Sequence, residues 1–146
     1  MTMADLWYER SVGIKLRGFE QDPHELSKKY SVLSESNAKG EAHGTKNTFK
    51  ENQIHFVKLV EEDGYWGDEL VDLINSFGGI HELKSIVESI SPKQLLVVIN
   101  KPKSDIEDGH SNDLSKESLQ VLCELNCDIS FNFFDGLTLR HPENSF

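Results

Sequence analysis

The chain has 146 residues, of which 37% are hydrophobic and 27% are charged, and its formal net charge is −10. This length suits one domain, and this composition excludes both a membrane protein and a highly charged disordered chain. The longest apolar run, residues 95–99, is much shorter than the roughly 18 residues of a membrane span. The negative charge disfavours nucleic acid, whose phosphates it repels, and it favours a basic partner or serves solubility.

The first half of the chain predicts two strands and a short helix. Apolar residues alternate with others over residues 12–17, which is typical of a half-buried strand. Asp22, Pro23 and Glu25 supply the N-cap, the first-turn proline and the capping-box acid of a helix. Residues 34–47 are small, polar and glycine-bearing, and they predict a long exposed loop or hairpin tip. A second strand follows over residues 54–59, with a bulge near Val57.

The second half predicts helices separated by two strands. Apolar residues at helical spacing cover residues 70–77 and, after the Gly78–Gly79 break, continue to Pro92. Residues 94–99 form a continuous apolar run, which indicates a strand buried on both faces, and residues 101–113 read as a polar loop. Ser115 caps a helix, with Leu119 facing inward, that ends at Asn126. Alternating apolar residues then predict an amphipathic strand over residues 129–133.

These elements predict a single α+β domain over residues 1–146, with a mixed, mostly antiparallel sheet and helices packed on it. The core residues expected from the strand and helix faces are Ile14, Leu16, Phe56, Leu73, Val97, Leu122, Ile129 and Phe131. The N-terminus has no basic patch followed by an apolar stretch. We therefore expect no secretory signal peptide and a cytoplasmic protein.

Motifs that would carry chemistry are incomplete in this sequence. Residues 40–46 resemble a phosphate-binding loop, but Lys46 follows Thr45 and no apolar strand precedes the loop. Residues 105–109 resemble the start of a calcium loop, but the glycine comes one position early. The six histidines show no metal-ligand spacing, and His55 is interpreted as a solvated neighbour of its strand. We predict no cofactor and no enzyme, while a pocket on the sheet face stays open as an alternative.

The two cysteines, Cys123 and Cys127, lie four residues apart at the end of a predicted helix. Two cysteines are too few for a disulfide framework, and their spacing is not Cys-x-x-Cys. No second pair of ligands lies nearby in the sequence. We interpret them as two small core residues and predict no metal site.

Acidic residues gather in two segments that we predict to bind a basic partner. Between residues 61 and 72 there are six acidic residues and no basic one, and Tyr65 and Trp66 lie among them. Aromatic residues on a polar surface are common interface anchors, although these two could equally pack into the core. The predicted partner-binding residues are Glu61, Glu62, Asp63, Tyr65, Trp66, Asp68, Glu69, Asp105, Glu107 and Asp108.

Over residues 12–135 the chain resembles the bacterial domain-of-unknown-function family four-two-seven-nine. The matching patterns are Leu16-Arg17-Gly18, Asp22-Pro23-x-Glu25-Leu26, Lys39-Gly40-Glu41, Leu114-Ser115-x-Glu117-x-Leu119 and Leu125-x-x-Asp128-Ile129-x-Phe131. The resemblance carries over no catalytic residues. Similar domains occur among small cytoplasmic proteins proposed as immunity proteins of bacterial toxin systems.

The resemblance and the charge together lead to one main functional hypothesis. It is an immunity-type protein of a bacterial competition system that neutralises a basic toxin domain, for instance a nuclease, without touching nucleic acid or membrane itself. Carboxylates would pair with the toxin's Lys and Arg side chains and block its substrate site. The alternative hypotheses are a small-ligand-binding module or an enzyme with a pocket on the sheet face, and a regulatory domain with an acidic surface.

Overall fold

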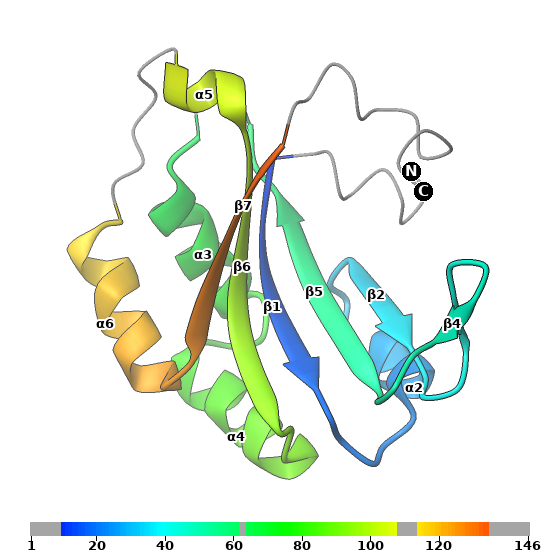
Figure 1. The fold of residues 1–146 in the computed structure, drawn as a ribbon. Coiled ribbons are helices and arrows are strands. Elements are labelled where there is room, and N and C mark those ends of the chain that lie inside the picture. Colours follow the sequence, from blue (N-terminus) through cyan, green and yellow to red (C-terminus); the bar gives the residue numbers. More distant parts are fainter. Residues whose placement is uncertain (1–9, 62–63, 108–113, 135–146) are drawn as a thin grey trace.

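Five strands form the main sheet of the computed structural model, which describes residues 10–61, 64–107 and 114–134. In sheet order they are β2 (Ser34–Asn37), β5 (Gln53–Leu59), β1 (Ser11–Arg17), β6 (Gln94–Pro102) and β7 (Asp128–Phe134). Two short strands, β3 (Ala42–His43) and β4 (Asn47–Thr48), form a separate hairpin beside β2 and β5 (Figure 1). The helices are α2 (Pro23–Lys29), α3 (Trp66–Asn75), α4 (Ile80–Ile90), α5 (Lys103–Glu107) and α6 (Lys116–Leu125).

The central strand β1 pairs antiparallel with both β5 and β6, and β2 pairs antiparallel with β5. Strand β7 runs parallel to β6, so the chain must cross over between them, and α5 and α6 lie in this connection. The predicted α+β class with a mixed, mostly antiparallel sheet is confirmed, and all four predicted strands are present. No helix in the described ranges is long and apolar enough to cross a membrane.

The core lies between one face of the sheet and the helices α3, α4 and α6 (Figure 1). Side chains alternate along a strand, so Val12, Ile14 and Leu16 all point to this face and are almost completely buried. Helix α2 closes the end of this layer near β2, where the rings of Tyr30, Phe56 and Phe77 meet edge to face with centroids 4.9–5.8 Å apart. None of the described helices covers the opposite face of the sheet (Figure 1).

The helix ends follow the sequence signals. The Asp22 side chain accepts a hydrogen bond from the His24 backbone N–H, and Pro23 opens α2 as predicted. Gly78 and Gly79 separate α3 from α4 with φ angles of 102° and 105°, a region that side chains with a Cβ avoid. The Ser115 side chain caps α6 by accepting from the Ser118 N–H.

Several predictions about burial and strand regularity are wrong. Ile129 and Phe131 are 40% and 50% exposed, because β7 is an edge strand at the rim of the core. Leu119 is 49% exposed on α6, and Cys123 is also exposed, so the cysteine pair is not a core pair. Strand β5 pairs residue for residue with β1, so it has no bulge. Residues 34–47 contain the predicted hairpin tip between β3 and β4, but residues 34–37 form the strand β2, which we did not predict.

Candidate functional site

The open face of the sheet carries two rows of polar side chains. Strand register places Glu35 of β2, His55 of β5 and Lys15 of β1 in one row. The next row contains Asn37, Gln53 and Arg17. In β1, Lys15 lies between the buried Ile14 and Leu16, and Arg17 follows Leu16. Because side chains alternate along a strand, Lys15 and Arg17 point to the face opposite the buried apolar residues.

The β3–β4 hairpin stands beside this face and is tied to α2. The Glu41 carboxylate accepts a hydrogen bond from the Ala38 N–H and lies within hydrogen-bond distance of His24 Nε2. These two contacts lower the pKa of Glu41 below its ordinary value, and the hydrogen bond from the Ala38 N–H has the larger effect. His24 Nδ1 also lies 2.8 Å from Ser36 Oγ of β2. The hairpin is therefore connected to the main sheet through a chain of polar contacts.

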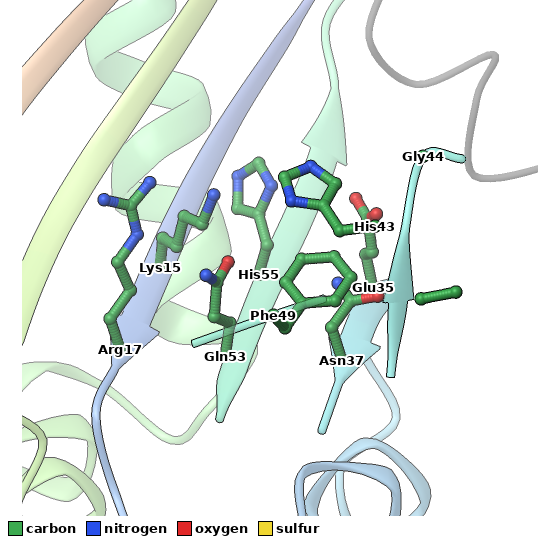
Figure 2. A pocket seen from close by; sticks show the side chains of 10 residues that line it. Lys15, Arg17, Glu35, Asn37, His43, Gly44, Phe49, Gln53 and His55 are labelled. Carbon is green, nitrogen blue, oxygen red and sulfur yellow. The ribbon is translucent and has the colours of Figure 1, made fainter. Parts of the chain in front are cut away.

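A cavity of about 500 Å³ lies between the hairpin and the open face of the sheet (Figure 2). The His43 and Phe49 rings stack with centroids 4.4 Å apart and form part of its wall. Its described lining residues come from β1, β2, β5 and the hairpin, and they are Lys15, Arg17, Glu35, Asn37, Ala42, His43, Gly44, Phe49, Gln53 and His55. Natural small-molecule sites have volumes of about 300–1,000 Å³.

A second cavity of about 190 Å³ continues across the sheet toward β6 and β7. It shares Lys15, Arg17, Glu35 and His55 with the larger cavity. Its apolar lining comes from Val57, Leu96 and Val98. At its far end the Asn100 amide donates to Ser11 Oγ and accepts from the Asn132 amide, at 3.0 Å each. Because the two cavities adjoin at the four residues that they share, we refer to them together as the groove.

His55 lies at the junction of the two cavities and is not the solvated side chain that we predicted. Its ring covers Gly13 of β1: a Cβ built on Gly13 would lie only 2.0 Å from His55 Nε2. The Nε2 atom is buried and has no hydrogen-bond partner in the described part of the chain. Burial, followed by the charges of Lys15 and Arg17, lowers the pKa of His55 to about 3. His55 is therefore a neutral imidazole at physiological pH.

The middle of the groove has a net positive charge. Burial and the neighbouring Arg17 charge lower the pKa of Lys15, and burial raises the pKa of Glu35. Among the described residues, Arg17 Nε is buried without a hydrogen-bond partner, and Arg17 Nη1 makes one long contact of 3.4 Å to Gln94 Oε1. Within the described ranges neither Lys15 nor Arg17 forms an ion pair. Two cations and one carboxylate thus meet in a chain that is otherwise strongly acidic.

Of the predicted partner-binding residues near Tyr65, some are exposed and others are buried. Tyr65 is 64% exposed, and Glu61 and Asp68 near it in the sequence are also exposed. Trp66 is only 4% exposed and packs in the core, where Lys101 Nζ lies 5.2 Å from its ring centroid. Tyr65 therefore lies on the surface and Trp66 in the core, so we remove Trp66 from the predicted partner-binding residues. Glu69 is half-buried and pairs with Lys58 at 3.1 Å.

In the second acidic segment, Asp105 is not available on the surface for a partner, contrary to our prediction. Asp105 is buried and its two carboxylate oxygens accept from Arg10 Nε and Nη2, both at 2.7 Å. We therefore remove it from the partner surface as well. Glu107 lies in α5, and Glu62, Asp63 and Asp108 lie outside the described residues.

The described residues include no group of three or more His, Cys, Asp or Glu side chains that could hold a metal ion. Cys127 is partly buried, and this burial raises the pKa of its thiol. His43, His55 and Glu35 all line the groove, and burial lowers the pKa of His55 to about 3.

Sequence reasoning missed the groove residues because each belongs to an unremarkable strand. The available signals were Gly13 inside an apolar strand, where glycine often marks a close approach, and two cations alternating with buried residues. The comparisons add nothing to this picture: no family model, no curated protein and no solved structure matches the chain. The resemblance to family four-two-seven-nine stays a prediction.

Proposed function

We propose that this chain is a binding protein whose ligand is a small polar molecule held between the open face of the sheet and the β3–β4 hairpin. One observation carries the proposal. Arg17 Nε and His55 Nε2, both buried and without a hydrogen-bond partner among the described residues, belong to side chains that line a cavity of about 500 Å³. An unpaired buried polar group costs about 1–3 kcal/mol, so proteins nearly always pair such groups. A polar ligand that takes the place of the groups covering these two atoms would recover this energy.

The test is a screen of cationic, neutral and anionic fragments by amide NMR shifts of the labelled protein. We expect hits to shift the amides of β1, β2, β5 and the hairpin. In Gln53→Trp, an indole replaces a side chain that lines the cavity, and the hits should be lost. Gln120→Trp adds the same indole at an exposed position of α6 and should leave them unchanged. A screen without hits at the groove in the wild type would contradict the proposal.

We also propose, as a second candidate, the immunity-type function with a basic toxin domain as the partner. The observation in its favour is the exposure of Tyr65 together with Glu61 and Asp68, on a chain with a net charge of −10. Exposed aromatic residues within a charged surface are typical interface anchors, and complementary charge speeds association.

This second candidate predicts a specific loss on charge reversal. The double variant Glu61→Lys with Asp68→Lys should fail to retain a basic protein that the wild type retains from the native lysate. Glu82→Lys with Glu88→Lys reverses two exposed charges on α4 and serves as the matched control. Association with the captured protein should slow as salt rises, because exposed charges are screened beyond about 8 Å at physiological ionic strength. Equal retention by both double variants would exclude this surface.

A further inference from the structure

The guanidinium of Arg17 has an edge that suits a carboxylate. In this same chain, Arg10 uses Nε and Nη2 to hold both oxygens of Asp105 at 2.7 Å. Such a two-bond contact between guanidinium and carboxylate is among the strongest polar contacts in proteins. Arg17 Nε, by contrast, is buried without an acceptor among the described residues, and its Nη1 has only the long contact to Gln94.

The charge of the groove favours a ligand with one negative charge. Among its described lining residues, Lys15 and Arg17 are cations, Glu35 is the one carboxylate, and the histidines are His43 and His55. Lys15, Arg17 and Glu35 in their charged forms together give one net positive charge, which a monoanion neutralises. A phosphate dianion would leave excess negative charge inside a protein whose net charge is already −10.

The surroundings of Arg17 supply apolar contact for the rest of the ligand. Val57, Leu96 and Val98 line the narrower part of the groove, and the stacked His43 and Phe49 rings line the wider part. Apolar side chains with a few convergent polar groups are typical of small-molecule sites. A molecule with a flat apolar body and one acidic group would contact both kinds of surface.

We propose that the groove binds a small carboxylic acid, with its carboxylate on the guanidinium of Arg17 beside Lys15 and an apolar body over the sheet. This inference rests on the proposed ligand-binding function and adds the chemical class of the ligand. Lys15 contributes a point charge, whereas Arg17 fixes the orientation of the carboxylate because its donors are coplanar.

The test compares three probes that share one ring: benzoate, the neutral isostere benzamide, and phenyl phosphate. Each is titrated into the full chain while amide NMR shifts are followed, and dissociation constants are fitted. Benzoate should bind at the groove at least tenfold more tightly than benzamide and more tightly than phenyl phosphate. Arg17→Gln should weaken benzoate about 10- to 100-fold, as expected for a lost charged hydrogen bond, and should leave benzamide nearly unchanged.

Two further variants make the result interpretable. Lys116→Gln removes the same charge from an exposed position on α6 and should leave benzoate binding within about twofold of the wild type, because solvent and salt screen distant charges. Lys15→Gln should weaken benzoate by a smaller factor than Arg17→Gln, and it replaces Arg17→Gln as the test if that variant does not fold.

The outcomes separate the two proposals. Equal binding of benzoate and benzamide at the groove would overturn the carboxylate inference and leave the ligand-binding function standing. Tighter binding of phenyl phosphate would overturn it in favour of a phosphate ligand. If no probe shifts the groove amides, the carboxylate inference fails, and the function itself fails only if the wider fragment screen is also empty there. If the benzoate dissociation constant is unchanged in Arg17→Gln, the carboxylate does not contact Arg17, and the assignment is refuted.

Discussion

Gly13→Ala is expected to destabilise the protein, because its new Cβ would collide with the imidazole of His55. The built Cβ lies 2.0 Å from His55 Nε2, 2.7 Å from His55 Cδ2 and 2.9 Å from the Phe56 carbonyl oxygen. The first two distances are well inside van der Waals contact, and they involve a side chain that is held over β1. The ring must therefore leave its place or β1 and β5 must separate.

The size of the effect follows from these contacts. Overpacking a well-filled site typically costs about 1–3 kcal/mol, and we expect the middle of this range because a ring can rotate more easily than backbone can shift. In a His55→Ala background the two ring contacts are absent and only the carbonyl contact remains. The cost of Gly13→Ala should then fall by about 1–2 kcal/mol, a coupling expected for residues in direct contact.

Urea unfolding of the wild type, both single variants and the double variant measures this coupling. The free energies of unfolding complete a double-mutant cycle, and unchanged urea dependence across the four proteins would show that the unfolded states are comparable. If Gly13→Ala costs the same free energy with His55 and with Ala at position 55, the ring does not occupy the space above Gly13. The description of the groove would then be wrong at its centre.

Three other predictions concern stability. The pKa of His55 falls from its ordinary value of 6.5 to about 3 on folding, so between these pH values the unfolded chain binds a proton at His55 and the folded protein does not. The free energy of unfolding should therefore drop by up to about 1.4 kcal/mol per pH unit as pH falls from 6.5 toward 3. His55→Ala should remove this part of the pH dependence, measured by urea unfolding at several pH values. Asp105→Ala should cost about 3 kcal/mol, since it removes the two hydrogen bonds that this buried carboxylate accepts from the Arg10 guanidinium; a loss below about 0.5 kcal/mol by chemical denaturation would contradict the burial of this pair. Trp66→Ala should cost about 3–5 kcal/mol and Tyr65→Ala less than about 0.5 kcal/mol, and similar melting temperatures for the two variants would refute their opposite placement.

The strands and helix ends could be predicted because their causes are local. The alternation in β1, the Asp22–Pro23 start of α2 and the Gly78–Gly79 break each act within a few residues. Even at Ile129 and Phe131 the alternation predicts the correct face of the strand, because both side chains point to the helix side of the sheet. What the pattern lacked was the position of β7 at the edge of the sheet, which only the strand order decides.

The groove could not be predicted because it depends on register between distant strands. Lys15, Glu35 and His55 come from three strands, and they meet only because β1 and β2 both pair with β5. The acidic segments failed for the same reason. Asp105 reads as a loop carboxylate until its partner Arg10, 95 residues earlier, is known. Composition correctly indicates an acidic chain but conceals the small cationic site inside it.

The central place of β1 has a consequence for how the chain is made. Its neighbours in the sheet, β5 and β6, begin at Gln53 and Gln94, so both are synthesised long after it. Until they emerge from the ribosome, the apolar side of β1 has no strand or helix layer to cover it, and the first pairing must close a loop of dozens of residues. Such non-local pairings slow folding and leave apolar surface open to aggregation. We therefore expect folding to wait for the second half of the chain, and chains truncated before Gln94 to remain unfolded and bind chaperones.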